Sequence, residues 1–165
     1  MQTVSNDRQI ALATTHRSHC PINLALEVLG DRWSLLIVRD LMFSDRHHYR
    51  ELLQSEEGIS SNILAERLGR LVDAGVLSRA DDPTHKQKAI YKLTPMGSDL
   101  LSVIAALGSW GRKYLPVTKR SAAVALSLEK GEMSGLKRLR ASLIEAHLAS
   151  PSLPTIRSKK TRTRD

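Results

Sequence analysis

The chain has one cysteine, six aromatic residues and no long apolar run among its 165 residues. A single cysteine cannot form an internal disulfide, which excludes a disulfide-framed scaffold and favours a reducing compartment. No stretch approaches the roughly 18 to 20 apolar residues that a membrane span needs, and the N-terminus lacks the apolar segment of a signal peptide. The sequence therefore predicts a cytoplasmic protein with no membrane partner and one domain of ordinary size.

The common signatures of catalysis are also missing. The sequence has no glycine-rich phosphate loop, no paired carboxylates in an apolar setting and no serine in a strand-to-helix elbow. His16 and His19 beside Cys20, or the pair His47 and His48, do not supply four ligands at the spacing of a structural zinc site. We therefore predict no enzymatic activity, no cofactor and no metal.

Positive charge is in excess, and most of it lies near the C-terminus. The chain carries 25 lysines and arginines against 17 acidic residues, which gives a formal net charge of +8. Residues 119–165 hold 11 of the basic residues and 4 of the acidic ones, so they contribute +7. A basic surplus favours a polyanionic partner such as nucleic acid. For the nearly neutral first 118 residues, evidence of such a partner must come from local patterns.

Aliphatic residues carry most of the apolar content, which favours packed helices over an all-β fold. Proline in a first turn at Pro21 and glycine at Gly30 delimit a helix over residues 21–29. A second helix, apolar on more than a narrow stripe and therefore mostly buried, is expected from about Asp31 to before Asp45.

The next segment predicts a helix-turn-helix. A short helix around residues 49–53 and a polar break at 55–58 precede a longer helix from about Ser60 to Ala74. A serine is a good N-cap for this helix, and Gly75 stands where a C-terminal glycine belongs.

A β-hairpin and further helices follow. Residues 76–79 and 89–93 are expected to pair across a long polar loop at 81–88. This order of elements is that of a winged helix-turn-helix, a mainly α fold with a small β-hairpin (α+β).

One helix is then expected from Thr94-Pro95 to about Tyr114. It has apolar rows on two faces, and a single domain cannot easily cover both. We therefore infer a partner chain, most simply a second copy. An extra amphipathic helix is expected at about 134–149, before a disordered basic tail. We divide the chain into an N-terminal arm, a DNA-binding and dimerisation domain, a helical extension and the tail, at residues 1–19, 20–116, 117–149 and 150–165.

The second helix of a helix-turn-helix can lie in the major groove, where its N-terminal part reads base edges. The candidates for this readout, on the outer face next to the N-cap Ser60, are Ser61, Asn62, Ala65 and Glu66. The candidates for phosphate contacts, all basic, are Arg46, Arg50, Arg67, Arg70, Lys86 and Lys88. The alternatives are that these arginines are solvated surface residues, or that the winged helix binds another protein.

An ordered set of motifs connects these elements. It comprises Cys20-Pro21, Leu29-Gly30-Asp31-Arg32-Trp33, Tyr49-Arg50-Glu51-Leu52, Gly58-Ile59-Ser60 and Tyr91-Lys92-Leu93-Thr94 with Gly97. Over about residues 20–114 the set resembles the HxlR-type transcription regulators, of the MarR-like superfamily. The resemblance implies a small bacterial DNA-binding protein that regulates nearby genes and dimerises through the N-terminal helix and the helix at 95–114. Ala65 and Gly69 depart from the residue types common in that family, so no operator preference carries over.

Cys20 is the candidate sensor. It precedes Pro21 and is expected at a helix N-terminus, where the helix dipole favours thiolate, with His19 and Arg17 adding positive charge. The resemblance implies that some relatives sense oxidants or electrophiles through the matching cysteine. With no second cysteine in the chain, oxidation gives an intersubunit disulfide, a mixed disulfide or a sulfenic acid. The alternative is a partly buried cysteine that only packs.

Together these features predict a homodimeric, nucleoid-associated regulator that binds an inverted-repeat operator in double-stranded DNA and responds to an oxidant or a small molecule. Repression is the expected mode, because a dimer on a promoter excludes polymerase without a further contact. Trp33 and Trp110 are expected in the aromatic core, with a ligand pocket as the alternative. The alternative function is a winged-helix protein-interaction module without specific DNA binding.

Overall fold

A computed structural model of the protein describes residues 18–44, 46–83, 85–119, 121–123, 126 and 133–148. Of the predicted N-terminal arm it describes residues 18 and 19, and the predicted basic tail lies outside the described residues. Over the described part of the chain, no helix is both long and apolar enough to span a bilayer.

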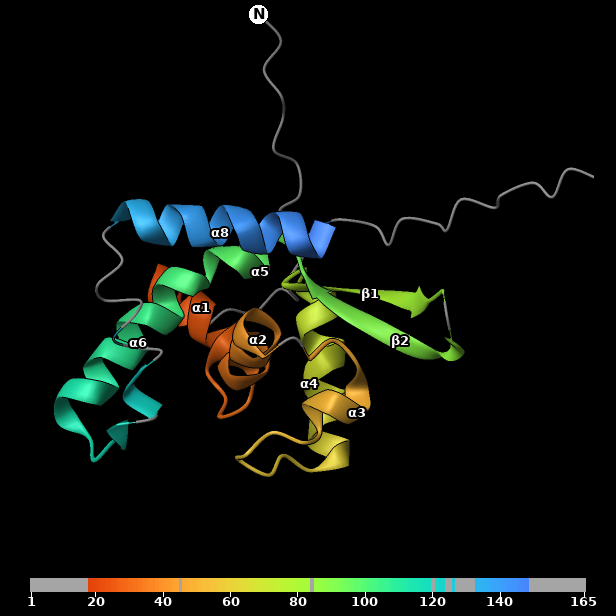
Figure 1. Ribbon diagram of the computed structural model, residues 1–165, viewed down its shortest axis with the longest axis horizontal. Helices are drawn as coiled ribbons and strands as arrows, with labels where there is room; N and C mark the ends of the chain where they lie inside the picture. Colours follow the sequence, from red (N-terminus) through yellow and green to blue (C-terminus); the bar gives the residue numbers. More distant parts are fainter. Residues whose placement is uncertain are drawn as a thin grey trace, which may run out of the picture.

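The fold is mainly helical with one antiparallel two-stranded hairpin, as predicted. Its elements are α1 (Pro21–Leu29), α2 (Ser34–Phe43), α3 (Tyr49–Leu52), α4 (Ser61–Asp73), β1 (Leu77–Asp82), β2 (His85–Leu93), α5 (Pro95–Asp99), α6 (Leu101–Tyr114) and α8 (Met133–Leu148). In Figure 1, α2 lies at the centre, α3, α4 and the hairpin lie on one side of it, and α6 extends on the opposite side.

The core forms where the apolar stripe of α4 meets α2. Leu64, Leu68 and Leu71 recur at helical spacing and are at most 1% exposed. They share one buried cluster with Val38 and Leu41 of α2. Burying a leucine side chain stabilises a fold by roughly 1.5–3 kcal/mol, so this seam fixes the orientation of α4. The predicted spacing of the long helix is thereby confirmed.

The chain turns tightly between α4 and the hairpin. Gly75 has φ +73°, the left-handed conformation that glycine adopts most readily. The Thr94 hydroxyl donates to the Gly75 carbonyl at 2.6 Å and accepts from the Gly97 N–H at 3.1 Å, so it caps α5. A Cβ on Gly97 would lie 2.2 Å from the Val76 carbonyl oxygen, so only glycine fits there.

The hairpin is longer than predicted, and the expected long loop at 81–88 is wrong. β1 extends to Asp82, which pairs with His85 after a register shift at Asp81. Backbone pairing needs no apolar side chains, and the buried Asp82 carboxylate accepts a hydrogen bond from His48 that fixes this end of the strand. The prediction of the strand ends was wrong because it was based only on the polar residues of this segment.

The single helix predicted from Pro95 to about Tyr114 is also wrong in detail. It is divided at Leu100 into α5 and α6. The Leu100 N–H donates to the Gly97 carbonyl three residues back at 3.2 Å, which tightens the turn there.

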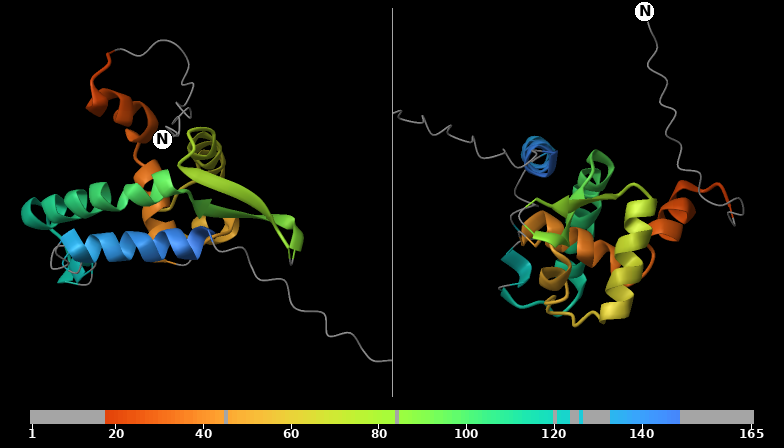
Figure 2. Two further views of the ribbon diagram at one scale, coloured as in Figure 1. Left: turned by 90° about the horizontal axis from the view of Figure 1, so that it is seen from above. Right: turned by 90° about the vertical axis from the view of Figure 1, so that its right-hand side faces the viewer.

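The C-terminal helix predicted at 134–149 is confirmed as α8. Figure 2 shows α8 lying alongside α5 and α6, with its last turn near the base of the hairpin. Among the α8 side chains that the structure describes, Leu143 and His147 are buried, at 7% and 6% exposure. Helix α8 is therefore packed against the hairpin strand β2 and against α5 and α6.

Candidate nucleic-acid interface

The N-terminus of α4 is anchored to α3. The Ser60 hydroxyl accepts from the Ile63 N–H at 3.4 Å and forms the predicted N-cap. The Tyr49 hydroxyl donates to the Ser61 carbonyl at 2.7 Å and lies 2.7 Å from the Ser61 hydroxyl. Tyr49 therefore holds in place the part of α4 that was predicted to read bases. This role was not predicted from the sequence.

The predicted readout residues lie together on the outer face of α4. Ser60, Ser61, Asn62, Ala65 and Glu66 are all exposed. Asn62 and Glu66 lie one helical turn apart, so an amide and a carboxylate point from the same face. The carboxylate of Glu66 forms ion pairs with two neighbours on α4, Arg67 at 3.2 Å and Arg70 at 4.0 Å.

Two of the predicted phosphate contacts are exposed next to this face. Arg50 on α3 is exposed. Arg70 is 52% exposed, and its Nη2 donates to the Glu27 carbonyl of α1 at 3.3 Å. On the hairpin, Lys88 is exposed, whereas the side chain of Lys86 lies outside the described part of the structure. The geometry brings a basic rim to one edge of α4.

Arg46 and Arg67, the other predicted phosphate contacts, are already engaged within the protein. Arg67 is 17% exposed and its Nε lies 3.3 Å from Asp31 Oδ1. Burial raises the pKa of Asp31, but hydrogen bonds from Ser34 and from backbone N–H groups outweigh it and leave the pKa below its ordinary value. Arg46 Nη1 donates to the buried Asp40 carboxylate at 3.3 Å. Both arginines thus brace the fold beneath the interface.

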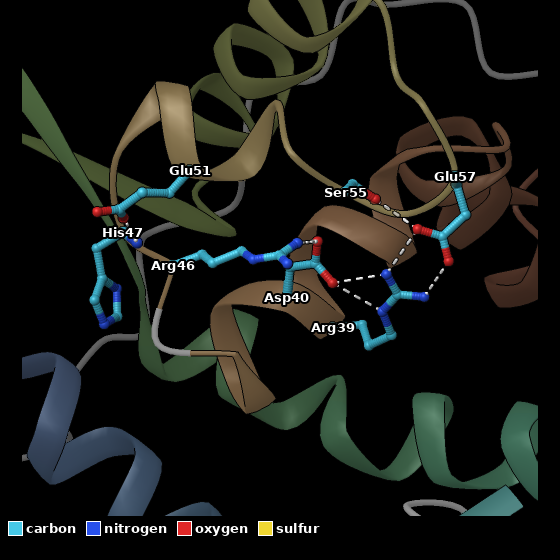
Figure 3. Close-up of polar contacts among 7 residues, drawn as sticks. All are labelled: Arg39, Asp40, Arg46, His47, Glu51, Ser55 and Glu57. Atoms are coloured by element: carbon cyan, nitrogen blue, oxygen red, sulfur yellow. Dashed lines mark hydrogen bonds and ion pairs between the residues drawn. The ribbon is translucent and has the colours of Figure 1, made fainter. Parts of the chain in front are cut away.

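A second ionic cluster fixes the turn between α3 and α4 (Figure 3). Arg39 of α2 donates to both oxygens of Glu57, at 2.6 and 3.0 Å, and also to Asp40 Oδ1. The Ser55 hydroxyl donates to Glu57 at 2.5 Å. The hydrogen bonds from Arg39 lower the pKa of Glu57 to about 2. The turn of the helix-turn-helix is thereby tied to α2, 18 residues earlier in the chain.

His48 connects the start of α3 to the hairpin. Its Nε2 lies 3.0 Å from Asp82 Oδ2 and its Nδ1 lies 3.2 Å from Glu51 Oε1. Glu51 also accepts the N–H groups of His47 and His48, both at 2.9 Å. The result is a polar joint between the helix-turn-helix and the strand β1.

Cys20 lies apart from this surface, at the N-cap of α1. Its thiol is exposed, which does not match the alternative of a partly buried packing residue. Hydrogen bonds from the backbone N–H groups of Asn23 and Ile22 lower the pKa of this thiol. A lowered pKa increases the fraction of thiolate, the reactive form of cysteine.

Exposed apolar residues lie on α6 and, separately, on α1. Leu107, Trp110 and Tyr114 of α6 are 51%, 57% and 60% exposed, and Ile22 and Leu26 of α1 are 71% and 57% exposed. The expectation that Trp110 lies in the core is wrong, because its position on α6 faces outward with Leu107 and Tyr114. Exposed apolar rows of this kind mark protein interfaces.

The family model described as HxlR-like helix-turn-helix matches residues 28–119. The chain belongs to this family. The HxlR-like region is 37% identical over 95 residues to the HTH-type transcriptional regulator Rv3095 of Mycobacterium tuberculosis. That match covers 58% of this chain and 59% of Rv3095, so the chain spans about three fifths of the length of that relative.

Two further proteins are similar to this HxlR-like chain. YodB, an HTH-type transcriptional regulator of Bacillus subtilis, is 32% identical over 96 residues, which cover 58% of this chain and 85% of YodB. The crystal structure of PA1607, assigned as a transcription factor, matches with a TM-score of 0.56 at 35% identity and covers 62% of this chain and 70% of PA1607. The family and these relatives are transcriptional regulators rather than enzymes.

Proposed function

We propose that this HxlR-like protein is a transcriptional regulator that binds double-stranded DNA through the outer face of α4. The observation that carries the proposal is the exposure of Asn62 and Glu66 on one face, with Arg50 and Arg70 at its edge. An amide and a carboxylate suit adenine and cytosine edges, and arginines suit phosphates. Lys86 and Lys88 on the hairpin are proposed to add phosphate contacts.

The proposed active form is a homodimer on an inverted repeat. The exposed apolar residues of α1 and α6 support a second copy as the partner, and we assign both DNA binding and dimerisation to residues 20–116. A two-fold dimer would present two recognition helices to successive major-groove faces, roughly 34 Å apart or a multiple of it. Occupancy of a promoter by such a dimer excludes polymerase, so we propose repression.

Cys20 is proposed to be the sensor of an oxidant or electrophile. Its exposed thiol and lowered pKa support this role. The relative YodB has been solved in reduced, quinone-bound and diamide-treated forms. This chain is related to YodB by sequence. The proposal for Cys20 depends on the exposure and the lowered pKa of the Cys20 thiol.

The DNA-binding proposal is tested with the promoter fragment that flanks the gene of this protein. Gel shifts at two salt concentrations should show a complex that resists an excess of unrelated DNA and weakens as salt rises. No complex at low salt would refute DNA binding and favour the protein-interaction alternative. DNA-independent dimer formation, measured by sedimentation, separates loss of the dimer from loss of the DNA contact.

The sensor proposal is tested by comparing the wild type with Cys20→Ser after treatment with diamide or a quinone. Intact mass and non-reducing electrophoresis should show an adduct or an intersubunit disulfide in the wild type only. DNA affinity should change in the wild type and stay constant in Cys20→Ser. Equal indifference of both proteins to the oxidant would refute the proposal.

A further inference from the structure

A pair of hydroxyl groups joins α3 to the first residue of α4. The Tyr49 hydroxyl oxygen lies 2.7 Å from the Ser61 carbonyl oxygen and also 2.7 Å from the Ser61 Oγ. The Tyr49 ring is half-buried and packs against the core, whereas Ser61 is exposed. Ser61 also precedes Asn62 in the group of predicted readout residues. The pair therefore connects a fixed ring to a side chain on the proposed DNA-binding face.

The number of protons fixes the direction of both hydrogen bonds. Tyrosine and serine hydroxyl groups carry one proton each, and a carbonyl oxygen carries none. At 2.7 Å from the Ser61 carbonyl oxygen, the Tyr49 hydroxyl is the donor, so its single proton is used there. The contact between the two hydroxyl oxygens then needs the proton of Ser61. Ser61 therefore donates to Tyr49, and towards any outside partner its hydroxyl can only accept.

A hydroxyl that can only accept is selective among the groups that DNA presents. In the major groove, the amino groups of adenine and cytosine donate hydrogen bonds, whereas the keto oxygens of guanine and thymine accept them. Phosphate oxygens carry no proton and also accept. An ordinary serine can bond to either kind of group, because its proton rotates to suit the partner. With its proton directed at Tyr49, Ser61 can bond only to an amino group.

We propose that Tyr49 is a positioning residue that sets a base preference: by accepting the Ser61 proton, it restricts Ser61 to the amino group of adenine or cytosine. Tyr49 acts through Ser61 and needs no contact of its own with DNA. The inference rests on the proposed DNA-binding function, and it adds the residue that determines one position of the recognised sequence. The hydroxyl pair itself is present without DNA and can be measured without it.

The test compares full-length variants that differ by single hydroxyl groups. Tyr49→Phe removes the acceptor of the Ser61 proton and keeps the packed ring, and Ser61→Ala removes the hydroxyl that would contact DNA. Tyr91→Phe, on β2, is the matched control, because it makes the same chemical change outside the helix-turn-helix. Anisotropy is measured with the promoter fragment and with copies in which each base pair is changed in turn. Purine in place of adenine, or pyrimidinone in place of cytosine, removes the amino group alone.

The wild type should show a position at which loss of the amino group lowers affinity about fivefold, as for one hydrogen bond. In Tyr49→Phe this preference should fall to about twofold or less, because Ser61 can then donate or accept and bonds to either kind of base edge. Preferences at the other positions should stay the same. Tyr91→Phe should keep the preferences of the wild type at every position.

Identical base preferences in the wild type and Tyr49→Phe would overturn the proposal. An equal loss of affinity for every base in Tyr49→Phe would also overturn it, because that is the result of a merely structural role. Ser61→Ala should lack the preference, and adding Tyr49→Phe to Ser61→Ala should not alter the base profile further. A further change of profile in the double variant would show that Tyr49 does not act through Ser61.

Thermal unfolding distinguishes a failure of this inference from a failure of the proposed function, because it measures the hydroxyl pair without DNA. The double variant of Tyr49→Phe and Ser61→Ala should lose less stability than the sum of the two single variants, since each change removes the same contact. Strictly additive losses would show that the two hydroxyl groups are not coupled and would overturn the inference. Absence of any DNA complex in the wild type would refute the proposed function and the base preference together, even where the coupling is found.

Discussion

Helices α4 and α6 each present one long exposed face, and the two faces differ in chemistry. On α4 the leucines are buried, and Asn62, Glu66 and Arg70 are exposed. On α6 the exposed residues include Leu107 and Trp110. Both helices are rich in aliphatic residues, so the difference lies in which residues remain in contact with water. The polar face suits a hydrated, charged partner such as DNA, whereas the apolar face suits another protein chain.

Adding a charge to the apolar face of α6 is expected to have the largest effect. Leu107→Glu should convert the proposed dimer to monomers, because a carboxylate cannot be buried cheaply in an apolar interface. Operator affinity should then fall by about 100-fold or more, since the two half-sites are no longer bound together. Sedimentation and anisotropy measure the two effects.

Ala141→Glu on the exposed side of α8 is the control, because it adds the same charge outside the apolar face. It should leave both the oligomeric state and the affinity unchanged. A Leu107→Glu protein that remains dimeric would show that α6 does not form the interface.

A change on the polar face should affect recognition without affecting assembly. Asn62→Ala removes one amide and should cost about tenfold in operator affinity, within the roughly 1–3 kcal/mol range of a base contact. Its unfolding temperature and dimer formation should stay the same, because Asn62 is exposed. Anisotropy with operator and scrambled DNA distinguishes recognition from general affinity.

Asp73→Ala, at the opposite end of the same helix, is the matched control. Any change in DNA affinity that Asp73→Ala causes should be the same for operator DNA and for scrambled DNA. Equal losses in Asn62→Ala for both DNAs would argue against base readout by α4.

Replacing an exposed arginine should weaken DNA binding, whereas replacing an arginine that is engaged within the protein should weaken the fold. Arg50→Ala should lower affinity for all DNA sequences several-fold and reduce the slope of log affinity against log salt by about one, as for a lost phosphate contact. Arg67→Ala should instead destabilise the fold by about 1 kcal/mol, because the partly buried Asp31 loses a partner. Salt titrations and thermal unfolding measure these effects, and a lowered unfolding temperature for Arg50→Ala would contradict this division.

The smallest effect concerns the turn that holds α4 in place. The pKa of Glu57 lies at about 2 in the folded protein, below its ordinary 4.5. The Glu57 carboxylate therefore stabilises the fold above about pH 4.5, and this contribution is lost as the pH falls through about 2. Glu57→Gln should lower the unfolding temperature slightly at pH 7, and the difference should shrink towards pH 2. Glu56→Gln, next to it and exposed, should show no such pH dependence.

The helices were predictable because their signals are local. The Pro21 start of α1, the Ser60 cap and the leucine spacing of α4 each lie within one element, and all three were confirmed. The strand ends at Asp82 and His85 were not predictable, because they depend on a hydrogen bond to His48 from another part of the chain.

The partners of polar side chains were the hardest to predict. Periodicity placed Arg67 near the outer face of α4 but did not show that Asp31 binds it. The pairs Arg39 with Glu57 and His147 with Leu93 are 18 and 54 residues apart, and no spacing rule connects them. Such contacts arise only when the chain has closed on itself.

The break at Leu100 lets the direction of α6 depend on the backbone torsions of one residue. Helix α6 has 14 residues, so at about 1.5 Å per residue it is roughly 21 Å long. A change of about 10° at Leu100 would swing its far end by about 4 Å, over the length of a helix with this rise. Trp110 and Tyr114 lie near that end. In the proposed dimer, a small adjustment of one backbone torsion would therefore change the separation of the two copies by more than the spacing of one DNA base pair.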